Sequence, residues 1–155
     1  MIPRKAVVTA ASPTEYHLPL QTLVDSEGVA KTALAIILDD LFASGIDSAA
    51  VVIYPGTRDI FLRAAGEHAD RLTLIEQEAP RGYGHAVWSA HEFTGDDPFV
   101  LLVGDHLYLS NDGPSCVSQM LKVASDHEGC ISAVNPTHES QLRYYGAVAA
   151  SRVPV

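Results

Sequence analysis

The sequence predicts a doubly wound α/β fold, in which helices pack on both faces of a mostly parallel sheet. Short apolar runs alternate with helix-like segments from one end of the chain to the other. Most of these runs are unbroken stretches of Val, Ile, Leu and Ala, which is the pattern of strands buried on both faces. The chain has 155 residues, 47% of them apolar, which suits one domain with its own core. We therefore expect residues 1–155 to form a single α/β domain.

Six apolar runs are candidate strands, because each is short and rich in branched side chains. In chain order they are Lys5–Ala10, Ala49–Tyr54, Leu72–Glu76, Phe99–Val103, Ile131–Asn135 and Gly146–Ala150. Ligands of open α/β sheets bind outside the carboxyl ends of the strands. The turns after Ala10, Glu76 and Val103 are therefore the places where we expect a functional site.

The segments between the strands carry start and stop signals of helices. The four expected helices are Ala33–Ser44, capped by Thr32 and ended by Gly45; Asp59–His68; His85–Phe93; and a helix that follows Asp112 or Ser115 and ends before Gly129. Strand and helix thus alternate, which favours parallel strands joined by helical crossovers.

Composition excludes several classes of partner. The formal charge is −9, and the ten basic residues are scattered, so no basic stripe exists to follow the phosphates of a nucleic acid. No apolar run approaches the ~20 residues of a membrane span, and the start of the chain has too short an apolar core for a signal peptide. We expect a soluble, cytoplasmic protein that binds neither nucleic acid nor membrane. Cys116 and Cys130 lack metal-type spacing and are expected to be buried.

A glycine-containing loop follows the third expected strand. Gln77 stands at its start, and Gly82 and Gly84 stand at the entrance of the next helix. Glycines let a ligand approach the backbone, and the free N–H groups of a helix start favour an acceptor-rich ligand. The Gln77 amide can donate and accept hydrogen bonds at once, as pairing with the edge of a base requires. The alternative is an ordinary loop, in which Arg81 is a solvated residue rather than a phosphate contact.

Asp105 and His106 follow the strand that ends at Val103. A carboxylate at the mouth of a buried strand needs a cation or hydrogen-bond donors, and Mg²⁺ shared with substrate phosphates is one such arrangement. In the plainer alternative, Asp105 caps the turn and His106 is its polar neighbour. A third interpretation joins both residues to His85 or His138 in a metal-dependent hydrolase.

The loop after the first expected strand runs from Ala10 and Ala11 into Ser12 and Pro13. It contains no glycine, so its N–H groups cannot easily gather around a phosphate. Glu15 in the same loop would repel an anion. The local sequence favours a plain loop.

Together these segments resemble the sugar-phosphate nucleotidyltransferase family, in its branch of UTP:glucose-1-phosphate uridylyltransferases. The resemblance runs from Lys5 to about Gly146. It rests on Lys5–Val8 with Ala10 and Ala11, Leu23–Asp25, Gln77 with Arg81–Ala86, Leu102–Asp105, and Tyr145 with Gly146. It implies a three-layer, Rossmann-like fold of the nucleotide-diphospho-sugar transferase type, corresponding to the N-terminal part of a longer nucleotidyltransferase.

The resemblance also implies a reaction and a set of roles. Family members transfer UMP from UTP to a sugar 1-phosphate, here glucose 1-phosphate, and release pyrophosphate, so the partners would be a nucleoside triphosphate and a sugar phosphate. The implied roles are nucleotide binding for Ala10, Ala11, Gln77, Gly82 and Gly84, catalysis and Mg²⁺ binding for Asp105, and sugar binding for His106 and Gly146.

The chain departs from the family pattern in two places. The family's first loop reads glycine, any residue, glycine, threonine, arginine, where this chain has Ser12 to Tyr16; the lysine expected before Leu23 is absent, with Lys31 as a partial substitute. Family members also run well past Val155. These departures favour an alternative function, a non-catalytic relative that binds a nucleotide or nucleotide sugar as a regulatory or interaction module. Apolar surface that a later half would cover is expected to drive a homodimer.

Overall fold

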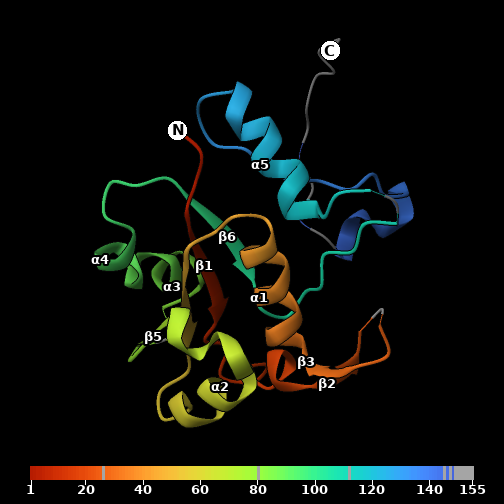
Figure 1. The fold of residues 1–155 in the computed structure, drawn as a ribbon. Helices are drawn as coiled ribbons and strands as arrows, with labels where there is room; N and C mark the ends of the chain where they lie inside the picture. Colours follow the sequence, from red (N-terminus) through yellow and green to blue (C-terminus); the bar gives the residue numbers. More distant parts are fainter. Residues whose placement is uncertain (26, 80, 112, 145, 147, 149–155) are drawn as a thin grey trace.

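Four parallel strands form the central sheet, in the order β5-β4-β1-β6 (Figure 1). The computed structural model describes residues 1–155 except 26, 80, 112, 145, 147 and 149–155. The strands are β1 (Lys5–Ala10), β4 (Ser48–Ile53), β5 (Leu72–Glu76) and β6 (Phe99–Val103). Three of them have the predicted bounds, and β4 is shifted by one residue. The predicted α/β fold with a mostly parallel sheet is confirmed.

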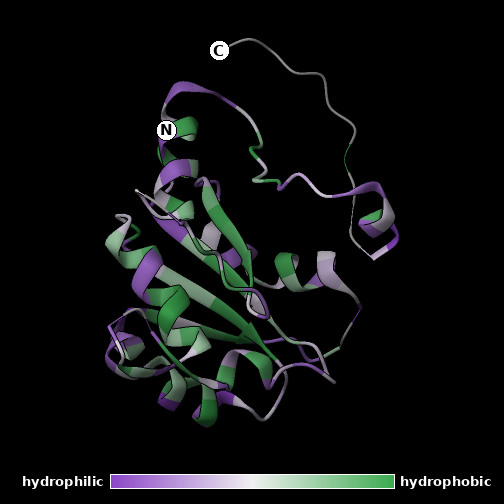
Figure 2. Ribbon diagram, turned by 90° about the vertical axis from the view of Figure 1, so that its right-hand side faces the viewer, coloured by the Kyte–Doolittle hydropathy of each residue, from purple (hydrophilic) through white to green (hydrophobic). Residues whose placement is uncertain are grey.

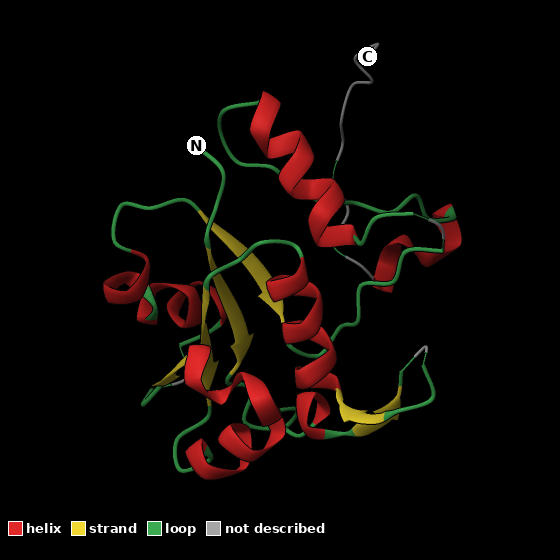
Figure 3. Cartoon of the chain, viewed as in Figure 1, coloured by secondary structure: helices red, strands yellow, loops and turns green. Residues whose placement is uncertain are grey.

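Helices cover both faces of the sheet (Figures 1 and 3). Helices α1 (Ala33–Ala43), α2 (Arg58–Ala65) and α5 (Cys116–Asp126) lie on one face, and α3 (Tyr83–Ser89) and α4 (His91–Thr94) lie on the other. Successive side chains of a strand point to opposite faces, so each of these strands needs apolar residues throughout. Figure 2 shows the strands coloured mainly as hydrophobic, as expected for a sheet between two helical layers.

The helix starts follow the predicted caps. The Thr32 hydroxyl accepts a hydrogen bond from the Ala35 N–H at 3.0 Å, and the Ser115 hydroxyl accepts one from the Ser118 N–H at 3.1 Å. Ser115 is therefore the cap of α5; Asp112 lies outside the described residues. Each cap satisfies a backbone donor that has no partner within its own helix.

Two predicted helices are interrupted. The helix expected over Asp59–His68 ends at Ala65, because Gly66 adopts a φ of 57°, and the chain continues as a 3₁₀ helix, η2 (Gly66–Arg71). The helix expected over His85–Phe93 divides at Ala90 into α3 and α4. In the part of the chain that the structure describes, no helix is both long and apolar enough to cross a membrane.

The predicted strand over Ile131–Asn135 is wrong. This segment has no regular structure, and Val134 is 65% exposed. It lies beyond α5, away from the sheet (Figure 1). A strand is stable only beside a neighbour that satisfies its backbone groups, and this segment has none next to it among the described residues.

Among the described residues after Asn135, the one regular element is the 3₁₀ helix η3 (Glu139–Tyr144). Most of the strand expected over Gly146–Ala150 lies outside the described residues; Gly146 itself is in no strand. The expectation of two buried cysteines is also wrong, since Cys130 is exposed and Cys116 is half-buried.

A short antiparallel hairpin, which the sequence did not predict, stands at the edge of the molecule (Figure 3). It joins β2 (Thr22–Val24) to β3 (Ala30–Thr32) and follows the 3₁₀ helix η1 (Leu18–Leu20). One carboxylate oxygen of Asp25 accepts the N–H groups of Glu27 at 2.9 Å and Val29 at 2.8 Å, which closes the turn.

Lys31 joins this hairpin to α1. Its Nζ lies 2.8 Å from Asp39 Oδ2 and 3.2 Å from Asp25 Oδ2, and His68 Nε2 lies 2.5 Å from Asp39 Oδ1. Hydrogen bonds to Asp39 and then Asp25 raise the pKa of Lys31. Burial alone would raise the pKa of Asp39, but hydrogen bonds from Lys31 and His68 outweigh it and hold this pKa below its usual value. The Asp39 carboxylate on α1 thus connects this helix to β3 through Lys31 and to η2 through His68.

We expect Asp39→Asn to destabilise the protein at neutral pH by about 1 kcal/mol, since solvent screens part of the pairing, and so to lower Tm by about 2–4 °C. A depressed pKa stabilises the fold above the unfolded pKa of about 4, and this stabilisation is lost as the pH falls through the folded pKa. The Tm difference between wild type and variant should therefore shrink below about pH 4.

Thermal melts from pH 3 to 8 measure this effect. Asp96→Asn is the control, because Asp96 is exposed in the turn before β6 and should change Tm little. A Tm difference for Asp39→Asn that is constant across this range would contradict the assignment.

Candidate functional site

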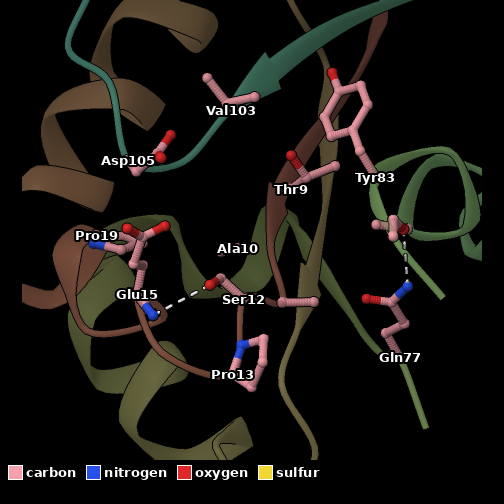
Figure 4. A pocket seen from close by; sticks show the side chains of 13 residues that line it. Thr9, Ala10, Ser12, Pro13, Glu15, Pro19, Gln77, Tyr83, Val103 and Asp105 are labelled. Atoms are coloured by element: carbon pink, nitrogen blue, oxygen red, sulfur yellow. Dashed lines mark hydrogen bonds between the residues drawn. The ribbon is translucent and has the colours of Figure 1, made fainter. Parts of the chain in front are cut away.

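A pocket of about 420 Å³ opens where β1 and β6 end (Figure 4). Its walls come from the loop after β1, from Gln77 directly after β5, from the start of α3, and from the end of β6. All of these strands point their carboxyl ends toward the pocket because they are parallel. This is the edge of the sheet at which the sequence predicted a site.

Five of the predicted site residues line this pocket: Ala10, Ala11, Gln77, Gly82 and Asp105. They come from three separate segments of the chain. The other three predicted residues, Gly84, His106 and Gly146, do not line it. His106 lies next to it, with Nδ1 2.7 Å from Asp105 Oδ1, whereas Gly146 is exposed.

Gln77 is the most enclosed polar residue of the pocket, with 4% of its surface exposed. Its Nε2 donates to the Gly82 carbonyl at 3.3 Å, and the same atom lies 2.8 Å from His85 Nδ1. Gly82 precedes α3 with a φ of 96°, a backbone conformation that favours glycine. The predicted polar residue and the predicted glycine are therefore one hydrogen-bonded unit.

Sequence reasoning missed Tyr83 as a pocket residue. Its ring stands on the wall opposite Asp105 and Glu15 (Figure 4). Burial raises the pKa of the Tyr83 phenol, and the nearby Tyr108 raises it further. The position of Tyr83 between two glycines at a helix entrance was the available signal, because such a side chain is presented where a ligand can approach.

Two backbone donors of the loop after β1 are satisfied within the loop itself. The Glu15 N–H donates to the Ser12 hydroxyl at 3.1 Å, and the Tyr16 N–H donates to the Ser12 carbonyl at 3.1 Å. The Tyr16 ring stacks on Tyr54, with 5.8 Å between centroids. These two N–H groups are therefore already used within the loop, as suits the plain loop that the sequence favoured.

The charged groups of the pocket are carboxylates. Glu15 and Asp105 line it, and no Lys or Arg does so among the residues described. The suggested substitute Lys31 is held by Asp25 and Asp39 and lines a separate hollow beside α1. Arg81 is exposed and lies outside the lining, so it is not a cation within this site.

The chemistry of Asp105 fits a hard divalent cation. His106 engages only Oδ1, and no described residue donates to Oδ2. Mg²⁺ is commonly held by one or two carboxylates together with substrate phosphates, so a site with a single protein ligand is sufficient. Asp105 is therefore the pocket residue that offers a carboxylate oxygen to such a cation.

The hydrolase interpretation receives no support from the geometry. His85 is paired with Gln77, and His138 Nδ1 lies 2.9 Å from the Ser140 hydroxyl. In the described part of the chain, Asp39, Glu67 and His68 are the only set of three or more His, Cys, Asp or Glu residues whose ligand atoms all lie within 4.8 Å of one another. Asp39 in that group is already paired with Lys31.

Gly104 allows β6 to approach β1 closely beneath the pocket. Its N–H donates to the Thr9 carbonyl at 2.8 Å. A Cβ on Gly104 would lie 3.1 Å from that carbonyl oxygen, 3.2 Å from Ala10 Cβ and 3.4 Å from Pro19 Cγ. The contacts to Thr9 and Ala10 are tighter than those of nearly all real Cβ atoms, so a side chain here would displace pocket residues.

The fold and the pocket define a doubly wound α/β protein whose ligand site lies at the carboxyl edge of the sheet. The model of the nucleotidyl transferase family matches residues 24–153. The chain belongs to this family.

Two curated relatives are both named as UTP–glucose-1-phosphate uridylyltransferases. A UTP–glucose-1-phosphate uridylyltransferase of Streptococcus pneumoniae is 29% identical over 174 residues, covering 94% of this chain and 58% of the relative. The UTP–glucose-1-phosphate uridylyltransferase 2 of Staphylococcus saprophyticus is 31% identical over 77 residues, which are 50% of this chain and 26% of the relative. The match thus covers little more than half of the length of the Streptococcus relative and about a quarter of the length of the Staphylococcus relative.

Solved structures agree on the fold. A UDP-glucose pyrophosphorylase complexed with UDP-glucose superimposes with a TM-score of 0.65 at 20% identity, covering 81% of this chain and 54% of that one. A UTP-bound UGPase from Acinetobacter baumannii gives a TM-score of 0.61 at 21% identity, covering 81% and 53%. The predicted Rossmann-like fold is confirmed.

Gly104→Ala should destabilise the protein by about 1–3 kcal/mol, because the added methyl group presses on the Thr9 carbonyl and on Ala10. Thermal melting and denaturant unfolding measure the loss. Gly84→Ala is the matched control, since a Cβ there would meet nothing within 4 Å and alanine suits a helix better than glycine. Equal stability of the two variants would show that β6 does not need this close approach.

Proposed function

We propose that the pocket binds a uridine nucleotide and that the protein acts in the transfer of UMP from UTP to a sugar 1-phosphate, with glucose 1-phosphate as the substrate. The observation that carries this proposal is the buried Gln77 amide, which lies beside Gly82 in a pocket at the carboxyl edge of the sheet. An amide there can pair with the edge of a base. The names of the curated relatives support uracil as that base.

The residues of the pocket suit distinct parts of such a ligand. We assign nucleotide binding to Ala10, Ala11, Gln77, Gly82 and Gly84, the last through its backbone in the first turn of α3. Small side chains at the end of β1 and glycines at the start of α3 leave the backbone open to a ligand. His106 beside Asp105 and Gly146 further along the chain are assigned to the sugar.

Asp105 is the proposed catalytic residue, and its role is to hold Mg²⁺. The metal would neutralise phosphate charge while an oxygen of the sugar phosphate attacks the α-phosphorus of UTP and pyrophosphate leaves. Such a reaction needs no covalent bond to the protein. It depends on positioning and on charge neutralisation, so loss of the carboxylate should affect turnover far more than folding.

A non-catalytic nucleotide-sugar binder is the second candidate. It is favoured by one observation: Glu15 and Asp105 line the pocket, whereas none of the described lining residues is basic. Phosphoryl transfer usually relies on cationic groups in addition to a metal. Under this alternative, the protein would bind the ligand and release no pyrophosphate.

Calorimetric titration with UTP and with UDP-glucose tests the proposal. We expect binding in Mg²⁺ and an affinity at least about tenfold lower for Asp105→Asn, because the metal loses its carboxylate ligand. Asp96→Asn, an exposed carboxylate outside the pocket, should bind like wild type. Pyrophosphate release on the same samples separates the enzyme from the binder, and no binding at millimolar ligand would refute both.

We also propose that the chain forms a homodimer and that it is cytoplasmic. The outer edge of β6 has no neighbouring strand among the described residues, and Leu101 on this strand is 37% exposed. Leu109, in the following loop, is 77% exposed. Apolar side chains near an open sheet edge favour association. Light scattering should give a dimer mass at high concentration, and Leu101→Lys should lower it; a monomer at every concentration would contradict the dimer.

A further inference from the structure

We propose that His85 is a positioning residue for base selection. By holding the Gln77 amide in one orientation, it presents the amide oxygen to the pocket, and the pocket therefore prefers a base whose ring nitrogen carries a hydrogen. This inference rests on the proposed function, because it specifies which base the same pocket takes. It concerns a residue that does not itself line the pocket.

The orientation of the Gln77 amide follows from its neighbours. A carbonyl oxygen can only accept a hydrogen bond, so the amide atom that lies 3.3 Å from the Gly82 carbonyl must be the nitrogen. That carbonyl is itself fixed, because it also accepts the Ala86 N–H at 3.2 Å in the first turn of α3. The start of the helix thus determines which end of the amide faces it.

The same nitrogen lies 2.8 Å from His85 Nδ1. Because Nε2 of Gln77 is a donor, Nδ1 must be the acceptor, and the neutral imidazole must carry its proton on Nε2. Both amide hydrogens of Gln77 are then used, one for Gly82 and one for His85. A flipped amide would set its oxygen against the Gly82 carbonyl and lose that bond, and it could keep a bond to His85 only in the tautomer that carries the proton on Nδ1.

The amide oxygen is left for a ligand. Among the described residues no group donates a hydrogen bond to it, and Figure 4 shows it on the side of Gln77 that faces the pocket. Gln77 is 4% exposed, and its oxygen is not among the fully buried atoms, so the small exposed part of this side chain includes the oxygen. An acceptor in such an enclosed place gains from a ligand that brings a donor.

Uracil and cytosine differ at ring atom N3, the position that would face the Gln77 oxygen. The ring N3 of uracil carries a hydrogen and can donate to the Gln77 oxygen, whereas N3 of cytosine has a lone pair and would face that oxygen with no hydrogen between them. The difference of one hydrogen bond at a buried site corresponds to about tenfold in affinity. Without His85, the amide keeps only its long bond to Gly82 and can turn its nitrogen toward cytosine.

Nucleotide titrations in Mg²⁺ test the inference. UTP, CTP and UTP methylated at N3 carry the same phosphates, so differences among them report the base alone. We expect wild type to bind UTP at least about tenfold more tightly than the other two. His85→Leu, which removes the acceptor, should bring the UTP-to-CTP ratio to within about threefold, and His85→Asn, which offers an oxygen near the position of Nδ1, should restore the preference.

The ratio of the UTP affinity to the CTP affinity distinguishes a positioning role of His85 from a merely structural one. A variant that only loosens the pocket weakens UTP and CTP alike and leaves their ratio unchanged, which would overturn the inference. Wild-type protein that binds UTP and CTP equally well would also overturn it while leaving the proposed function in place. Wild-type protein that binds no nucleotide would overturn the proposed function itself.

The tautomer can be measured directly in the wild-type protein, with one variant used to assign the signals. In ¹⁵N-resolved NMR spectra, an imidazole nitrogen without a proton resonates far from one that carries it. The His85 signals, assigned by their absence from the His85→Asn spectrum, should show Nδ1 unprotonated and Nε2 protonated at neutral pH. A proton on Nδ1 in the wild-type protein would overturn the inference, whatever the variants bind.

Discussion

Strand β1 is hydrogen-bonded on both sides, to β4 and to β6, and the pocket depends on this double pairing. Thr9 lies opposite Val52 on one side and Val103 on the other. The Gly104 N–H continues the second ladder beyond the end of β6. A slip of one residue would turn every side chain of β1 to the other face, so the apolar pattern fixes the register. The register in turn determines where Ala10 and Asp105 meet.

The two sides of the pocket differ in charge. Gln77 and Tyr83 form a wall with neutral hydrogen-bonding groups, while Glu15 and Asp105 stand opposite them (Figure 4). Phosphates near two carboxylates are repelled over short distances, where salt screens little. Under the proposed function, the chain's own residues would recognise the base end of the nucleotide, and a metal ion would be needed at the phosphate end. The proposal thus divides recognition and charge neutralisation between protein and cofactor.

The sequence predicted the sheet and much of the pocket because both depend on local patterns. Buried strands such as β4 need nearly unbroken apolar runs, and polar residues directly after strands, such as Gln77 and Asp105, stand out against them. Ile131–Asn135 has the same pattern but no neighbouring strand among the described residues, and a pattern alone cannot supply one. Side-chain pairing is equally non-local, since nothing in the sequence near Lys31 shows that Asp39 and Asp25 engage it.

The contacts within the loop between Ser12 and Tyr16 are coupled, which limits how the loop can be changed. The Ser12 hydroxyl accepts the Glu15 N–H, the Ser12 carbonyl accepts the Tyr16 N–H, and the Tyr16 ring stacks on Tyr54. Glycine at Ser12 would remove the hydroxyl, and arginine at Tyr16 would remove the stacked ring; neither change alone would gather N–H groups around a phosphate. Substitutions of residues in direct contact are not additive. Rebuilding a phosphate-binding loop at this edge of the sheet therefore requires several simultaneous substitutions rather than one.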